Sequence, residues 1–259
     1  MPLHPLIVPI FVFFFGLCIG SFLNVCIYRV PISKSIVHPP SACPRCGYEI
    51  RFYDNIPVFS YLLLGGRCRQ CRVHIPVRYP LIEILSGLAA LGVYYRFGLT
   101  LEAPVYYVFI SVLLVITFID IDYRIIPNII SLPGIPIFFL ASFLTPAVTF
   151  TESLIGILAG GGSLFLVAWG YTLVTKKEGM GGGDIKLLAM IGALLGWKGV
   201  FFTIFVSSAV GTLVGLGVMI YTRSNMKLAV PYGPFLSIGA VAYIFFGPAL
   251  IYWYLNLFR

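Results

Sequence analysis

Charged side chains are scarce in this sequence. Asp, Glu, Lys and Arg make up 10% of its 259 residues, whereas a soluble globular domain carries about 25%. Hydrophobic residues make up 59%, and the mean hydropathy is +0.99. This composition excludes an ordinary soluble domain and predicts a polytopic membrane protein.

Long apolar runs supply the predicted membrane spans. A helix needs roughly 20 apolar residues to cross the hydrocarbon core of a bilayer. Such runs occupy residues 6–27, 81–98, 101–119, 128–148, 153–174, 185–197, 199–221 and 231–256. Because 185–197 is short and 81–98 only just long enough, we expect an all-α membrane protein with about eight transmembrane helices.

The first apolar run lacks the marks of a cleaved secretory signal. No basic stretch precedes it, it is longer than a typical signal core, and no small-residue cleavage site follows it. We therefore expect residues 1–27 to form the first transmembrane helix.

Lysines and arginines predict the orientation, because basic residues near span ends remain in the cytoplasm. The loop after the first span, residues 28–80, is the most basic part of the chain, so it is expected inside. With eight crossings, 14 of the 17 basic residues fall on that side. The net charge of +8 is then an orientation signal and an attraction to anionic lipid. No nucleic-acid partner is expected.

The loop at 28–80 carries four cysteines in the pattern C-x2-C-x21-C-x2-C: Cys43, Cys46, Cys68 and Cys71. Two such knuckles can bring four thiolates around one Zn²⁺. Two disulfides are the competing interpretation, but a cytoplasmic loop is kept reduced. We therefore predict a zinc-binding loop domain, with a structural metal because four sulfurs leave no open position. Cys18 and Cys26, in the first span, are assigned to packing.

Two further stretches place acidic residues at span ends. "FIDIDYRIIPN", residues 118–128, holds Asp120 and Asp122, which are two positions apart and so point about 200° from each other on a helix. In "GGGDIK", residues 181–186, Asp184 follows three glycines at the first turn of a span. The glycines do not form a nucleotide-binding loop, since neither GxxxxGK[ST] nor a GxGxxG after a strand is present.

The predicted topology places Asp120 and Asp184 on the same side of the membrane. Two nearby carboxyl groups can share a proton and act as acid and base on a water, as in an aspartic protease. The residues alone leave other interpretations open: helix caps in a zinc-loop membrane scaffold, or a proton-coupled carrier. No internal repeat of the kind that such carriers contain is visible.

Taken together and in order, the cysteine loop, "FIDIDYRIIPN" and "GMGGGDIKLLAMIGALLGW" resemble the bacterial type IV prepilin peptidases. These are bifunctional leader peptidases and N-methyltransferases of the GxGD aspartic protease group. The resemblance implies that Asp120 and Asp184 are the catalytic pair, within a transmembrane bundle at 81–259, and that the cysteine loop binds zinc. It implies prepilin and pseudopilin substrates, cut after a leader glycine at the cytoplasmic face. The new N-terminus would be methylated from S-adenosylmethionine, whose binding residues the sequence does not identify.

Four further residues each have two possible roles. Lys186 and Arg124 are the cations nearest in sequence to the aspartates, and snorkelling to lipid phosphates is favoured over tuning of a carboxyl group. Glu83 and Asn55 match positions of the same family, either as contributors to its chemistry or as braces for the loop.

Overall fold

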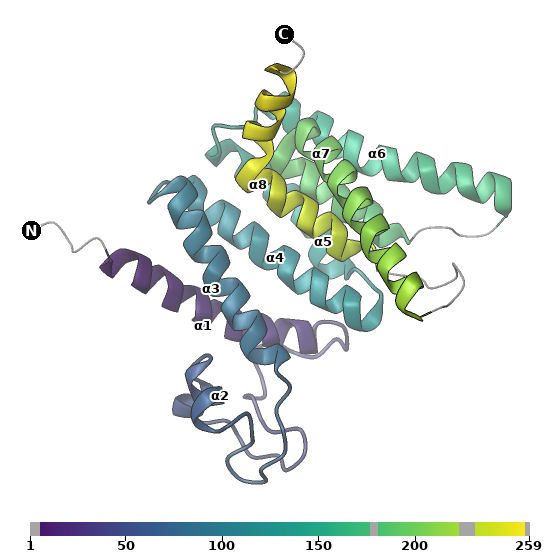
Figure 1. The fold of residues 1–259 in the computed structure, drawn as a ribbon. Coiled ribbons are helices and arrows are strands. Elements are labelled where there is room, and N and C mark those ends of the chain that lie inside the picture. The colour runs from purple at the N-terminus through teal and green to yellow at the C-terminus, as the bar shows by residue number, and fades with distance from the viewer. Residues whose placement is uncertain (1–5, 177–180, 223–230, 257–259) are drawn as a thin grey trace, which may run out of the picture. The chain divides into compact units, whose positions relative to one another are not determined.

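The structure is a computed structural model, and it describes residues 6–176, 181–222 and 231–256 (Figure 1). Within those residues the regular structure is helical, apart from two isolated β-bridges, which confirms the predicted all-α membrane class. The chain divides into two compact units, Met1–Val115 and Ile116–Arg259. The division falls inside helix α4 (Glu102–Tyr123).

The first unit is built on α1 (Ile7–Arg29) and α3 (Arg78–Phe97). Two glycines of α1 let these helices pack closely: a Cβ at Gly16 would lie 2.7 Å from the Cα of Gly87, and one at Gly20 2.6 Å from the Cα of Glu83. Small residues four apart are a common way to bring membrane helices together.

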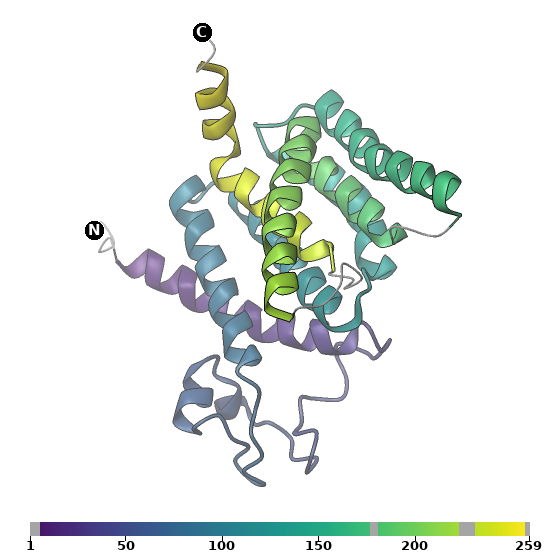
Figure 2. The same cartoon turned by 45° about the vertical axis from the view of Figure 1, so that its right-hand side comes forward.

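The loop between α1 and α3 contains a short 3₁₀ helix, η1 (Phe52–Asn55), and a one-turn helix, α2 (Phe59–Leu63). Figures 1 and 2 show it extending from the ends of α1 and α3 that it joins.

The second unit contains α5 (Asn128–Ala141), the 3₁₀ turn η2 (Ser142–Leu144), α6 (Phe150–Thr175), α7 (Gly182–Thr222) and α8 (Gly233–Asn256). Here too glycine permits close packing, since a Cβ at Gly156 of α6 would collide with the carbonyl oxygen of Gly192 in α7. The hydroxyl of Ser153 donates a hydrogen bond across the same interface to the carbonyl of Ala193. In Figure 2, α6 runs alongside the first part of α7.

Five helices of the described residues are long and apolar enough to cross a membrane: α1, α4, α6, α7 and α8. The 41 residues of α7 would measure about 60 Å if straight, twice the thickness of the hydrocarbon core. Gly196 interrupts this helix with φ 68° and ψ −179°, a conformation suited to glycine. The break separates the segments predicted as 185–197 and 199–221.

The segment predicted at 128–148 is shorter than expected, because α5 ends at Ala141. Ser142 and Thr145 end it by donating side-chain hydrogen bonds to backbone carbonyls, those of Phe139 and Ser142 respectively. Its 14 residues measure about 21 Å, less than a full crossing. The eight predicted segments thus correspond to eight helical pieces: α1, α3, α4, α5, α6, the two parts of α7, and α8.

Four basic residues that were counted for the predicted orientation lie outside the described residues. Three belong to the 14 expected on the inner side, Lys177, Arg223 and Lys227, and one to the three expected on the outer side, Arg259. Met180 of the glycine motif also lies outside the described residues.

Candidate active site and metal centre

Asp120 lies near the C-terminal end of α4 and is 5% exposed. The helix ends three residues later at Tyr123, and Arg124 adopts a left-handed conformation while its N–H bonds the carbonyl of Asp120. Asp122 is exposed on the same helix, as its spacing from Asp120 predicts. Of the two acids in "FIDID", only Asp120 is held in the interior.

The Asp120 carboxylate has a backbone partner from the far end of the chain. Gly233, the first residue of α8, donates its N–H to Asp120 Oδ2 over 3.0 Å. A Cβ at residue 233 would lie 2.7 Å from that oxygen, so only glycine allows this approach. The hydrogen bond fixes one carboxylate oxygen and leaves Oδ1 for other partners.

Asp184 occupies the first turn of α7 and is half-buried. The preceding residue, Gly183, packs against Ile126, whose Cβ would lie 2.8 Å from a Cβ at residue 183. Ile126 Cδ1 would also lie 3.4 Å from a Cβ at Gly233. Ile126 therefore lies between the two glycines that adjoin the carboxyl groups.

Asp120 and Asp184 are close enough for their negative charges to repel each other. Both side chains are withdrawn from water to a large degree, which strengthens that repulsion. A pair of this kind lowers its energy by sharing one proton, which gives one acid and one base. The structure thus brings together the two aspartates that the sequence analysis paired.

The nearby cation Lys186 contacts an amide, which is neither of the two roles expected from the sequence. Its Nζ donates to Oδ1 of Asn128 over 2.8 Å, which ties the start of α7 to the start of α5. At the other end of the first part of α7, Lys198 pairs with Glu152 over 3.0 Å. Lys186 and Lys198 thus lie at opposite ends of this segment.

Four cysteine sulfurs form a separate cluster in the first unit. The ligand atoms of Cys43, Cys46, Cys68 and Cys71 all lie within 4.8 Å of one another, and none is in a disulfide. Sγ of Cys43 is 3.7 Å from that of Cys71, and Sγ of Cys46 is 4.0 Å from that of Cys68. Tetrahedral zinc with bonds of about 2.3 Å requires sulfurs about 3.8 Å apart, so the cluster fits that metal.

The two halves of the cluster share one backbone design. A β-bridge closes each knuckle, Ala42 with Glu49 and Arg67 with His74. The residue after the second cysteine of each is left-handed: Gly47 with φ 70° and Arg72 with φ 57°. Only the first knuckle has the glycine that this conformation favours.

The backbone also prepares Cys43 for a metal. The N–H of Cys46 lowers the pKa of the Cys43 thiol to about 6; burial opposes this shift, and the N–H of Arg45 adds to it. The lowered pKa favours the thiolate of Cys43, the form that binds metal. Cys46 shifts the opposite way: the N–H of Tyr48 lowers its pKa, but burial and hydrogen bonds to the neighbouring sulfurs outweigh this and raise it to about 11.

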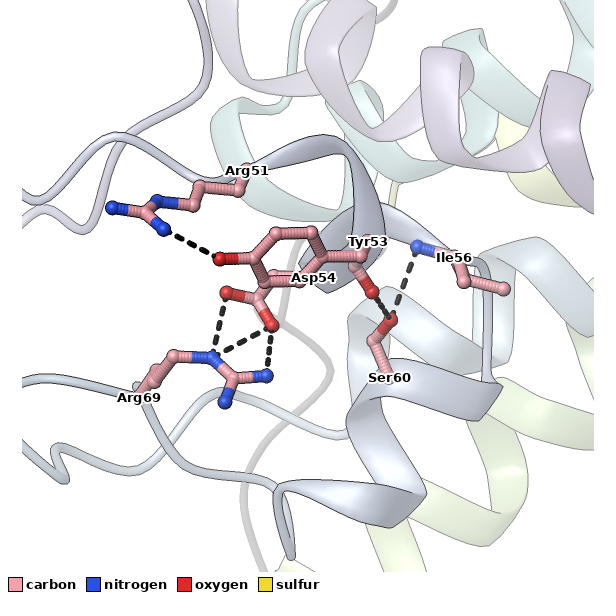
Figure 3. A network of polar contacts seen from close by, with 6 residues as sticks. All are labelled: Arg51, Tyr53, Asp54, Ile56, Ser60 and Arg69. Carbon is pink, nitrogen blue, oxygen red and sulfur yellow. Dashed lines mark hydrogen bonds and ion pairs between the residues drawn. The ribbon is translucent and has the colours of Figure 1, made fainter.

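A polar network anchors the second knuckle to the middle of the loop (Figure 3). The guanidinium of Arg69, between the second pair of cysteines, binds Asp54, whose side chain is 5% exposed, with Nε 2.9 Å from each carboxylate oxygen. The same guanidinium lies 5.5 Å from the centroid of the Tyr53 ring. Ser60 donates to the carbonyl of Tyr53, which holds η1 against α2.

Glu83 braces the loop, one of the two roles considered for it. It is 8% exposed on α3, and its Oε2 accepts a 2.7 Å hydrogen bond from the N–H of Val58. Val58 has φ 63°, an uncommon value for a β-branched residue.

Gly233 was not identified from the sequence as a site residue. The available signal was "PYGP", residues 231–234, a break at the start of the last apolar run. Nothing in that pattern shows that its N–H reaches an aspartate 113 positions earlier.

Two family models match the chain. One describes a bacterial peptidase A24 N-terminal domain and covers residues 14–97; the other describes the type IV leader peptidase family and covers residues 107–216.

Curated relatives align along most of the chain. A prepilin leader peptidase/N-methyltransferase of Pseudomonas aeruginosa is 36% identical, over 98% of this chain and 95% of the relative. Proteins of the same name from Pseudomonas putida and Aeromonas hydrophila are 37% and 35% identical, over 90% and 95% of this chain and 88% and 93% of the relatives. No solved structure matches the chain.

Proposed function

The chain belongs to the type IV leader peptidase family, and from that membership we propose that it removes the leader from prepilins and pseudopilins and then N-methylates the new N-terminus. It is a multi-pass protein of the bacterial inner membrane. Both activities are in the names of the relatives that align along most of its length. The remaining question is which residues perform each of them.

Asp120 and Asp184 are the proposed catalytic pair of the peptidase. The observation that supports this assignment best is that the fold brings two partly buried carboxyl groups, 64 positions apart in sequence, within range of mutual repulsion. One carboxylate takes a proton from a water as the water oxygen bonds to the scissile carbonyl carbon. The other carboxyl gives a proton to the leaving nitrogen as the C–N bond breaks.

The N–H of Gly233 would hold Asp120 Oδ2 during this exchange, so that Oδ1 faces the water. Exposed Asp122 has no part in the proposal. The positive-inside pattern supports a site near the cytoplasmic face, where the leader of a prepilin would remain.

The four loop cysteines would hold one structural Zn²⁺. Their spacing fits tetrahedral sulfur coordination, and Cys43 is predisposed to the thiolate form. A loop with few buried apolar side chains gains much of its folding energy from such a metal. The domain division into 1–27, 28–80 and 81–259 remains a prediction.

S-adenosylmethionine is the proposed methyl donor, because methylation of an amine requires an activated methyl group. When bound, it supplies a methyl group on a positively charged sulfur, which the new N-terminal amine can accept.

Leader cleavage by the purified protein tests the peptidase assignment. The protein in detergent micelles is incubated with a prepilin peptide, and mass spectrometry measures leader loss. Asp120→Asn and Asp184→Asn should each abolish cleavage, whereas Asp122→Asn, the matched control on the same helix, should retain most of it. Equal loss in all three variants, or activity in the first two, would contradict the assignment.

A further inference from the structure

The loop of the first unit contains a segment, residues 52–66, with a large exposed apolar surface. Arg51 and Arg67 flank this segment, and it contains no lysine or arginine of its own. Its one charged side chain, that of Asp54, is paired with Arg69. Three of its large apolar side chains are 86%, 69% and 87% exposed: Phe52, Leu62 and Leu63. So much apolar surface on a short segment is typical of a contact with a partner or a membrane.

The segment folds back along α1. The ring of Phe59, the first residue of α2, stacks on the ring of Phe14 with centroids 5.9 Å apart. Phe14 lies near the middle of α1, 15 residues before Arg29 at its loop end, which corresponds to about 22 Å of helix. One leaflet of hydrocarbon is only about 15 Å thick, so this contact lies at membrane depth. In Figures 1 and 2, α2 lies opposite the middle of α1 rather than beyond its end.

A second contact holds the neighbouring backbone between the two helices. The N–H of Val58 donates to Glu83 of α3, and the hydroxyl of Ser21 in α1 bonds the same side chain. Ser21 precedes Arg29 by 8 residues, or about 12 Å of helix. The start of α2 is therefore fixed well above the loop ends of α1 and α3, at a level where lipid surrounds these helices.

The backbone of the segment has the internal hydrogen bonds that hydrocarbon requires, because no water is available there to replace a missing partner. The carboxylate of Glu83 supplies one acceptor, and the hydroxyl of Ser60, a buried residue, supplies another and itself donates to the carbonyl of Tyr53. Six N–H groups bonded to these acceptors or to nearby carbonyls belong to Ile56, Val58, Ser60, Leu62, Leu64 and Gly66. The turn can therefore present its apolar side chains to lipid without exposing these N–H groups.

We propose that residues 52–66 form a re-entrant segment, which inserts among the lipid acyl chains of the leaflet on the loop side of the membrane. Arg51 and Arg67 are both exposed, so their guanidinium groups can reach anionic headgroups on that side. The segment enters and leaves on one side and adds no crossing. One cysteine knuckle precedes it and the other follows it, so its insertion would hold both knuckles against the membrane surface.

Quenching of tryptophan fluorescence by brominated lipid tests the insertion. The protein is placed, one copy per nanodisc, in phosphatidylethanolamine and phosphatidylglycerol, and its three native tryptophans are replaced by phenylalanine: Trp169, Trp197 and Trp253. Leu63→Trp then introduces a single reporter, and Leu62→Trp gives a second one on the same turn. The matched control is Val37→Trp, because Val37 is another apolar residue of the loop and is 70% exposed. A single gel-filtration peak checks that each variant is folded.

Bromine atoms at the middle of the acyl chains should quench the Leu63→Trp and Leu62→Trp reporters by about half or more, because an inserted side chain lies among those chains. Val37→Trp should lose little emission in the same lipid. Arg29 donates to the carbonyls of Ser35 and Pro39, which keeps Val37 at the loop end of α1. The two positions are similarly exposed, so only their depth in the membrane separates them.

Equal quenching of Leu63→Trp and Val37→Trp would mean that the loop only rests on the surface, and no quenching of Leu63→Trp and Leu62→Trp would mean that the segment lies in water. Either result overturns the proposal. Addition of an uncleaved prepilin peptide separates lipid from substrate: quenching should persist, and its loss would show that the segment binds prepilin instead. None of these measurements depends on leader cleavage or methylation, so their outcome is independent of the proposed function.

Discussion

The N–H of Gly233 donates to Oδ2 of Asp120 across 3.0 Å, and it joins the first residue of α8 to the last turns of α4. The contact is buried. A backbone donor cannot change its protonation state, so it stabilises the carboxylate oxygen that it contacts and makes proton exchange at the other oxygen more favourable. The proposed peptidase site thus depends on a residue with no side chain.

Gly233→Ala should therefore reduce leader cleavage strongly. Its Cβ would displace Asp120, and the hydrogen bond to a charged group contributes about 1.5–3 kcal/mol, which corresponds to about 10- to 100-fold in rate. The rate of leader loss by mass spectrometry measures the effect. Gly215→Ala is the control, because a Cβ there meets nothing within 4 Å; equal rates in the two variants would refute the positioning role.

Adjacent glycines before Asp184 should differ in their tolerance of alanine. At Gly183 a Cβ would lie 2.8 Å from Ile126, whereas at Gly182 it meets nothing within 4 Å. Overpacking of this kind costs about 1–3 kcal/mol, so Gly183→Ala should slow cleavage about tenfold or more and Gly182→Ala should have little effect. Cleavage assays on both variants, with methylation of a leaderless peptide as the folding check, decide the matter. Slower cleavage by Gly182→Ala than by Gly183→Ala would contradict the packing role of Gly183.

The cysteine cluster should contain one zinc per chain. Cys68→Ser removes one sulfur and should lose the metal, whereas Cys18→Ser, in α1 and outside the cluster, should retain it. Elemental analysis measures the zinc, and limited proteolysis should cut residues 28–80 faster once a chelator removes it. Zinc in the Cys68→Ser protein, or disulfides among the four loop cysteines of the purified protein, would contradict the metal assignment.

Glycine at the left-handed residue of the second knuckle should make the loop hold zinc more tightly. Arg72 has φ 57°, which costs a non-glycine residue about 1 kcal/mol. Arg72→Gly should therefore slow zinc release to a chelator about fivefold, and Gly47→Ala, the equivalent position of the first knuckle, should speed release by a similar factor. Release is followed with a zinc-sensitive dye. Faster release from Arg72→Gly would mean that the arginine side chain itself stabilises the loop.

Prediction from the sequence succeeded where a pattern is local. The CxxC pairs predicted four converging sulfurs, because each tight turn positions two of them before any tertiary contact forms. The apolar runs predicted the helices to within a few residues at most ends. The end of α5 was missed, since Ser142 and Thr145 lie inside an apolar stretch and donate side-chain hydrogen bonds to the backbone carbonyls three residues before them.

Amino-acid order alone determined the membrane class, the cysteine cluster and the two acidic span ends, because composition and short spacings act over a few residues of chain. Tertiary structure decided which helix ends meet. The N–H of Gly233 donates to Asp120, the N–H of Val58 donates to Glu83, and Ile126 packs between Gly183 and Gly233. Each of these contacts joins residues at least 25 positions apart. Such contacts depend on how closely whole helices pack, which no single segment specifies.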